Sequence, residues 1–262
     1  MKQFLIIPDK NDLKESLELV QKYSLGFEYN DFFKPDVLDD KTKLQEMIEA
    51  YKVLSLPSYC TMHGAFFDVL PFSVDAKIRE ISVLRIEQSI QAAEQIGAKA
   101  VVFHTNYNPF LNDKEYVKNW IEENVMIWGN ILEKYPEINI YLENMFDTTP
   151  DIMEALSEKL CQYKNYGVCL DYAHASLSAV APTEWAKRLG KYVKHVHIND
   201  NDLISDLHLA WGDGQINRQN FYDCYEKYMK DVSVLVETSS LKNVKRSLEV
   251  LEKEGFLERP KC

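Results

Sequence analysis

The sequence predicts a single α/β domain, a (β/α)8 TIM barrel that covers residues 1–262. Its length of 262 residues matches the roughly 250 residues that one such barrel needs. Short apolar runs also alternate with longer amphipathic segments along the chain, and such near-continuous apolar runs are typical of parallel strands buried on both faces. The eight strands are expected at residues 4–8, 25–29, 59–63, 100–104, 138–143, 167–171, 193–198 and 232–237.

Amphipathic helices are expected between these runs. In one of them the apolar residues recur at spacings of three and four, at Val83, Ile86, Ile90 and Ala93. Gly97 follows and predicts the end of that helix. Eight strand–helix units in strict alternation favour a closed barrel over an open doubly wound sheet. An open sheet would also have a Gly-rich turn after its first strand, and residues 8–12 contain no glycine.

Composition narrows the function classes. The net charge of −11 gives no general attraction to nucleic acid or to anionic lipid. Five cysteines without a C-x-x-C pair argue for a reducing compartment and against a disulfide framework or a cysteine zinc site. The apolar run at the N-terminus is too short for a signal peptide, and no run of about 18 apolar residues predicts a membrane span. We therefore expect a cytoplasmic protein.

Imidazoles and carboxylates gather at the carboxyl ends of the predicted strands, where a barrel forms its active site. Five of the six histidines lie there. The candidates are His63, His104, Glu143, Asp171, His174, His197, Asp206, His208 and Glu237. Four carboxylates at close range raise one another's pKa unless a cation joins them. Imidazoles and carboxylates together are ligands of zinc, manganese or iron, so the sequence predicts a divalent metal site and an enzyme.

The candidates differ in the strength of their support. Four of them end a strand and are the firmest: Glu143, Asp171, His197 and Glu237. Asp206 and His208 lie in a loop, where solvated surface residues are the alternative. A single histidine in a strand is more often a hydrogen-bonded core residue than a ligand. His195 shares a face with His197 but lies one layer deeper, so we expect it in the core or behind a ligand.

Three segments resemble the xylose isomerase-like TIM barrel superfamily, which contains sugar isomerases and epimerases, inosose-processing enzymes and endonuclease IV. They are residues 141–144 (YLEN), 167–174 (GVCLDYAH) and 195–200 (HVHIND). The resemblance spans essentially all eight units. Its epimerase branch implies one ion, often manganese, held by residues matching Glu143, Asp171, His197 and Glu237. In that branch the two glutamates move the substrate's proton, and a residue matching His174 binds substrate.

The endonuclease IV branch implies three zinc ions and nine ligands, and all nine candidate positions match it. Residues 206–214 (DLHLAWGDG) are similar to that branch's D-x-H-x-x-x-G-x-G stretch. Two departures stand against a nuclease. The first strand lacks a His-and-Gly-rich opening, and Asn201 and Asp202 replace the lysine that usually follows the strand-seven motif. Taken together, the two branches of the resemblance imply Mn²⁺ or Zn²⁺ as the cofactor, with one to three ions per chain.

The loops expected at the mouth of the barrel contain almost no basic residues, although a DNA-binding enzyme must neutralise several phosphates. Lys10 and Lys34 in the first two loops are the nearest candidates. No lysine or arginine occurs in residues 63–76, 104–113, 143–150, 171–182 or 197–217. We therefore expect no nucleic-acid partner. Aromatic residues in these loops suit a polyol or sugar, with Trp211 and Phe66 as candidates for the pocket wall and loop packing as the alternative.

Three hypotheses remain. The first is a metal-dependent sugar or polyol isomerase or epimerase that transfers a proton next to a carbonyl, with Glu143 and Glu237 as base and acid. The second is a multinuclear, endonuclease IV-like metallohydrolase of a small phosphoester, which requires His63, His104, Asp206 and His208 as ligands too. The third is a sugar-binding barrel without catalysis. The sequence names neither the substrate nor the oligomeric state, and a homo-oligomer is compatible with it.

Overall fold

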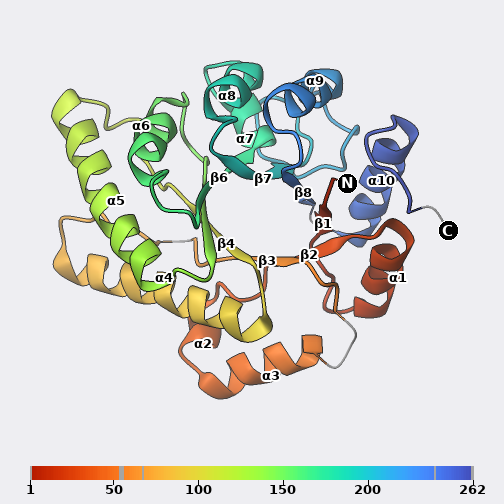
Figure 1. The fold of residues 1–262 in the computed structure, drawn as a ribbon, viewed down its shortest axis with the longest axis horizontal. Coiled ribbons are helices and arrows are strands. Elements are labelled where there is room, and N and C mark those ends of the chain that lie inside the picture. The colour runs from red at the N-terminus through yellow and green to blue at the C-terminus, as the bar shows by residue number, and fades with distance from the viewer. Residues whose placement is uncertain (1, 53–55, 67, 239, 261–262) are drawn as a thin grey trace.

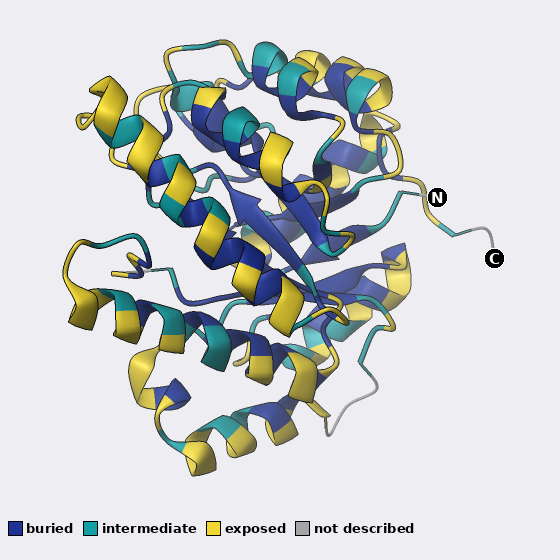
Figure 2. Ribbon diagram, turned by 60° about the vertical axis from the view of Figure 1, so that its left-hand side comes forward, coloured by how far each residue is buried: buried dark blue, intermediate teal, exposed yellow. Residues whose placement is uncertain are grey.

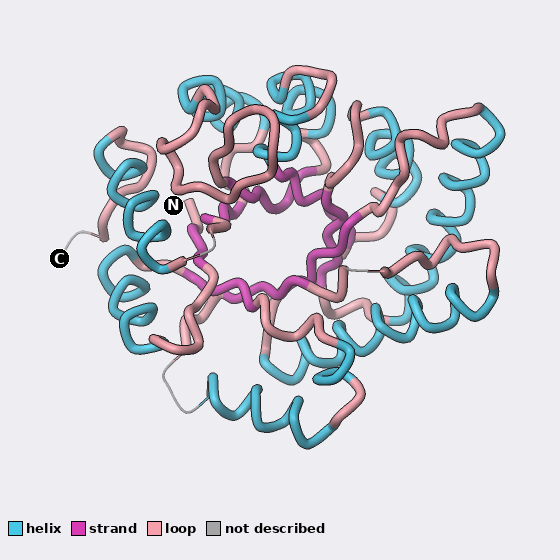
Figure 3. Tube along the Cα trace, turned by 180° about the vertical axis from the view of Figure 1, so that it is seen from behind, coloured by secondary structure: helices cyan, strands magenta, loops and turns pink. Residues whose placement is uncertain are grey.

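The predicted barrel is confirmed. The computed structural model describes residues 2–52, 56–66, 68–238 and 240–260. Its strands form one closed parallel barrel in which neighbours follow the order of the chain from β1 to β8, and β1 pairs with β8. Helices surround this ring of strands on all sides (Figure 1). The view from behind shows the strands as a closed ring with loops crossing its rim (Figure 3).

All eight strands lie where the apolar runs predict them, with ends that shift by one or two residues. Their bounds are β1 Phe4–Ile6, β2 Gly26–Tyr29, β3 Cys60–His63, β4 Ala100–His104, β5 Asn139–Glu143, β6 Tyr166–Asp171, β7 Val193–Ile198 and β8 Ser233–Val236. β1 ends before Pro8, a residue that has no backbone N–H to donate to the sheet. Glu237 lies one residue beyond the end of β8.

The helices are α1 Leu13–Tyr23, α2 Pro35–Leu38, α3 Lys41–Lys52, α4 Ala76–Ile96, α5 Lys114–Lys134, α6 Asp151–Leu160, α7 Tyr172–Leu177, α8 Pro182–Leu189, α9 Arg218–Tyr228 and α10 Leu241–Lys253. Gly97 ends α4 at a φ of 84°, a conformation that glycine adopts without steric cost. Each long helix turns a buried face to the strands and an exposed face outwards (Figure 2). Of the helices in the described ranges, none is long and apolar enough to cross a membrane.

The register of the strands places their carboxyl ends side by side. His104 on β4 pairs with Glu143 on β5, and Asp171 on β6 pairs with His197 on β7. Side chains two residues apart on a strand share a face, so His195 and His197 point the same way. Chemically reactive side chains from four consecutive strands therefore meet at one mouth of the barrel.

Candidate metal centre

A central group of four residues lies at the mouth of the barrel. It consists of Glu143, Asp171, His197 and Glu237, and one ligand atom from each lies within 4.8 Å of those of the others. Nδ1 of His197 is 3.5 Å from Oε1 of Glu143 and 3.3 Å from Oε2 of Glu237. All four residues are buried. The four positions that end strands thus share one small volume.

A second group adjoins the first and shares Glu143 with it. Nε2 of His63, at the end of β3, lies 3.2 Å from Nε2 of His104, at the end of β4. Both nitrogens are 3.6 Å from Oε2 of Glu143. Because Oε1 of Glu143 faces His197, the two oxygens of one carboxylate serve two neighbouring groups.

A third group forms where the loop after β7 folds over the mouth. Oδ2 of Asp206 lies 3.3 Å from Nε2 of His174 and 3.0 Å from Nε2 of His208. His174 sits on α7, which begins directly after β6, and Oδ1 of Asp171 accepts a hydrogen bond from its backbone N–H at 2.6 Å. Nδ1 of His174 is 3.6 Å from Oε1 of Glu143. All nine predicted ligands therefore belong to three adjoining groups.

The central group fits a cation, because its buried polar atoms lack partners. Within the described part of the chain, no hydrogen bond reaches Oε2 of Glu143, Oδ2 of Asp171, Nδ1 of His197 or Oε2 of Glu237. Buried polar groups are normally paired, and leaving one unpaired costs about 1–3 kcal/mol. An ion in the central group would satisfy the atoms of Asp171, His197 and Glu237, and an ion in the second group would satisfy Oε2 of Glu143. The mix of nitrogen and oxygen ligands suits zinc or manganese.

The pKa shifts of Asp171 and His174 also indicate a site that is short of positive charge. Burial raises the pKa of Asp171, and the charges of Glu237 and Glu143 raise it further. Burial would lower the pKa of His174, but Asp171 and Asp206 hold it well above its usual value. Both shifts favour the protonated forms, on the Asp171 carboxyl and on the His174 imidazole, and so lower the negative charge of the site. A bound cation would replace these protons.

Glu28 on β2 is a fully buried carboxylate that the sequence analysis missed. Its Oε1 lies 3.2 Å from Nε2 of His197, and its Oε2 lies 3.1 Å from Nε2 of His195 and accepts a 2.6 Å hydrogen bond from Thr61. Burial opposes its ionisation, but His197 and His195 keep its pKa below the usual value. Such a contact turns the opposite nitrogen, Nδ1 of His197, towards the central group. A charged residue inside the apolar run at 25–29 was the available signal.

His195 occupies the deeper layer that the sequence predicts. Its Nδ1 is 2.7 Å from Oγ of Ser233, and its Nε2 faces Glu28. Both ring nitrogens therefore have partners, and the imidazole is fully buried. This residue connects β7 to β2 and β8 beneath the central group.

A cavity of about 530 Å³ opens above the three groups, and its lining includes His63, His104, Glu143, His174, Asp206, His208 and Glu237. Phe66 lines it as well. The prediction for Trp211 is wrong, because its indole is fully buried away from this cavity. Its Nε1 donates to Oη of Tyr222 on α9, and its backbone N–H donates to Oγ of Ser247 on α10. A large ring gains more from burial between two helices than from exposure at the mouth.

The mouth carries little positive charge. Lys10 is one of the two basic residues expected near it, and its Nζ lies 3.1 Å from Oδ1 of Asp31. The lysine side chain is 56% exposed, so this is a surface ion pair. The other, Lys34, is exposed at the start of α2.

The chain belongs to the xylose isomerase-like TIM barrel family, whose model matches residues 19–254. Among curated relatives, it is 29% identical to the uncharacterised protein MJ1311 of Methanocaldococcus jannaschii, over 80% of this chain and 72% of the relative. It is 26% identical to a probable endonuclease 4 of Mycobacterium leprae, over 67% of this chain and 71% of the relative.

The fold is also similar to that of a D-tagatose 3-epimerase-like protein of known structure. The two superpose with a TM-score of 0.78 at 24% identity, over 97% of this chain and 98% of the other. At this level of identity the likeness concerns the fold. Fold likeness does not fix a reaction, so the function must be argued from the site residues.

Proposed function

We propose that this protein is a multinuclear metallohydrolase that cleaves a small phosphoester. The observation that carries the proposal is the arrangement of all nine candidate ligands in three adjoining groups. A one-ion isomerase needs only the central group. It leaves no ligand role for the second and third groups, which are built from His63, His104, His174, Asp206 and His208. The geometry therefore favours the hypothesis that the sequence alone ranked second.

Each group would hold one ion, and two side chains would connect the three sites. Glu143 would connect the first two sites through its two oxygens, and His174 would join the third site to the centre. Divalent ions there would neutralise the phosphoryl oxygens and promote attack by water. In the overall reaction the oxygen of water bonds to phosphorus and the phosphorus–oxygen ester bond breaks. The leaving oxygen takes a proton, which yields an alcohol and inorganic phosphate.

The substrate is proposed to be a small molecule because the mouth could not neutralise a nucleic-acid backbone. The loops after β3 to β7 contain no lysine or arginine, and Lys10 is paired with Asp31. Proteins that bind DNA place several such residues against the phosphates. The proposed substrate therefore differs from the one that the name of the Mycobacterium leprae relative, a probable endonuclease 4, implies.

A sugar or polyol isomerase or epimerase is the second candidate, and one observation favours it. Glu143 and Glu237 both belong to the central group, with His174 beside them. Two carboxylates at one centre could move a proton to and from a carbon next to a carbonyl. The structural likeness to a D-tagatose 3-epimerase-like protein is compatible with a carbohydrate substrate.

Metal content distinguishes the two candidates. Protein purified without chelator should contain three zinc or manganese ions per chain by elemental analysis. Asp206→Ala should lose one ion, because Asp206 contacts both histidines of the third group. Asp213→Ala is the matched control, since Asp213 lies in the same loop and pairs with Arg246 outside the three groups.

The activity assay runs in parallel. Phosphate release from a panel of phosphomonoesters should be seen with the wild type and with Asp213→Ala, and should fall sharply with Asp206→Ala. One ion per chain, together with exchange of a sugar's α-hydrogen for solvent deuterium, would instead establish the isomerase.

A further inference from the structure

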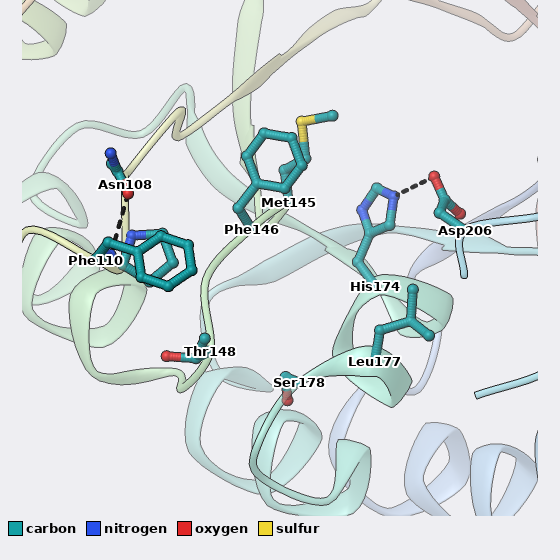
Figure 4. Close-up of a pocket in the computed structure, with 10 residues that line it drawn as sticks. Asn108, Phe110, Met145, Phe146, Thr148, His174, Leu177, Ser178 and Asp206 are labelled. Atoms are coloured by element: carbon teal, nitrogen blue, oxygen red, sulfur yellow. Dashed lines mark hydrogen bonds and ion pairs between the residues drawn. The ribbon is translucent and has the colours of Figure 1, made fainter. Parts of the chain in front are cut away.

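A second, apolar pocket lies directly beside the metal centre. Its volume is about 470 Å³, and its walls include Phe110, Met145, Phe146 and Leu177. The rings of Phe110 and Phe146 lie on one side of it, and His174 and Leu177 lie on the other (Figure 4). The pocket is built from the loops after β4, β5 and β7 and from α7 with the residue that follows it.

This pocket adjoins the metal cavity. His174, Asp206 and Met145 line both of them. A molecule whose polar end is held at the third group would therefore have the apolar pocket next to it. The third group stands at the boundary between a charged compartment and an apolar one.

The apolar lining of this pocket indicates what kind of ligand group it binds. His174 and Asp206, at the boundary, are the titratable residues of its described lining. Phe110 is 91% exposed and Phe146 is 61% exposed, and both belong to one apolar patch at the pocket, which is the kind of surface that marks a binding site. Within the same loop, the backbone N–H of Phe110 donates to Oδ1 of Asn108. The described walls suit an uncharged ring and contain no lysine or arginine that would bind a second phosphate.

We propose that this pocket binds the aromatic part of the substrate, so that the enzyme hydrolyses an aryl phosphoester. This inference rests on the proposed phosphoester hydrolysis. The phosphate would lie at the three groups and the ring between Phe146 and Leu177. Water adds to phosphorus, the bond from phosphorus to the phenolic oxygen breaks, and that oxygen leaves with a proton as the phenol. The pocket volume lies within the roughly 300–1,000 Å³ of small-molecule sites, which accommodates more than a methyl group.

Binding of two phosphonates to the zinc-loaded protein tests the pocket separately from turnover. Phenylphosphonate and methylphosphonate carry the same anionic head, and neither contains an ester bond for water to cleave. Isothermal titration should show about ten- to a hundredfold tighter binding of phenylphosphonate, because the ring leaves water. Equal affinities, or no binding of either compound, would overturn the proposal.

Variants in the pocket wall test whether the phenyl ring binds in this pocket. Phe146→Ala and Leu177→Asn should each reduce the preference for phenylphosphonate by at least about fivefold while leaving methylphosphonate binding unchanged. Leu84→Asn is the matched control, because Leu84 lies on α4, is 43% exposed and is absent from the pocket lining. It should keep the full preference. An unchanged preference in both wall variants would place the ring elsewhere.

Hydrolysis of phenyl phosphate, followed by phosphate release, separates this proposal from the one on which it rests. Selective binding of phenylphosphonate without hydrolysis of any phosphoester would contradict the hydrolase and leave the aromatic site standing. Hydrolysis of alkyl phosphates without phenyl selectivity would support the hydrolase and contradict the aromatic site.

Discussion

The central and third groups are two parts of one centre, but they are built differently. The central group stands at strand ends, and the side chains of Glu143, Asp171 and His197 are at most 1% exposed. In the third group, the side chains of Asp206 and His208 come from a loop and are 36% and 31% exposed. Strand ends are held by the whole barrel, whereas a loop depends on local contacts. We therefore expect the central and second groups, which stand at strand ends, to be rigid. We expect the third group, which depends on a loop, to be more labile.

The largest effect is expected from Glu143→Gln, because Glu143 belongs to two groups. An amide nitrogen would replace one of the two ligand oxygens without a large change in volume. Elemental analysis should show the loss of two ions, and phosphate release should fall at least about a thousandfold. Glu137→Gln, in the exposed turn before β5, should keep both. Retention of three ions by Glu143→Gln would remove the shared carboxylate from the centre.

A smaller effect is expected from Glu28→Gln, which acts beneath the central group. Loss of its charge should weaken the hold on Nε2 of His197, and changes behind a ligand typically cost about 10–100-fold in metal affinity. Competition with a chromophoric chelator measures this affinity. The readout separates positioning from folding, because a purely structural role would lower the melting temperature of the metal-free protein and leave the affinity of the folded protein unchanged.

Graded chelation tests the contrast between strand and loop directly. Because Asp206 and His208 are partly exposed, the ion of the third group should leave first, at a chelator strength about tenfold lower than the others require. Metal content after equilibrium dialysis gives the order. His208→Ala should lack this first ion and release the remaining two as the wild type does. Simultaneous release of all ions would show that the three groups act as one unit.

The smallest effect concerns Asp147, a buried carboxylate of the same mouth that belongs to none of the three groups. Burial raises its pKa to about 6, although Thr105 and the backbone N–H of Met145 donate to it. A raised carboxyl pKa means that the native state holds its proton more tightly than the unfolded chain does. Stability from this residue is therefore present below the ordinary pKa of 3.8 and is lost as the pH rises through 6.

Asp147→Asn removes this titration. Relative to the wild type, the variant should gain about 1–3 kcal/mol in free energy of unfolding between pH 4 and pH 8. Chemical denaturation of both proteins with and without metal measures the difference at each pH. A stability difference that does not change with pH would show that the pKa of Asp147 is not raised in the folded protein.

The elements that the sequence predicted best are those with a regular pattern of apolar residues. The apolar runs located all eight strands because parallel strands buried on both faces have no polar face to interrupt them. Gly97 marked the end of α4 because few other residues adopt its positive φ. The same logic could not place Trp211, since a loop has no period. Its position depends on Tyr222 and Ser247, which come from two later helices.

The order of residues along the chain by itself determined the barrel and the fact that His63, His104, Glu143, Asp171, His197 and Glu237 meet at one mouth, because parallel strands bring their carboxyl ends together. Only the tertiary structure decided that Glu143 turns one oxygen to each of two groups, that Glu28 supports His197 from below, and that an apolar pocket adjoins the third group. These features depend on the direction of single atoms and on the packing of loops from distant segments. Neither leaves a periodic trace in the sequence.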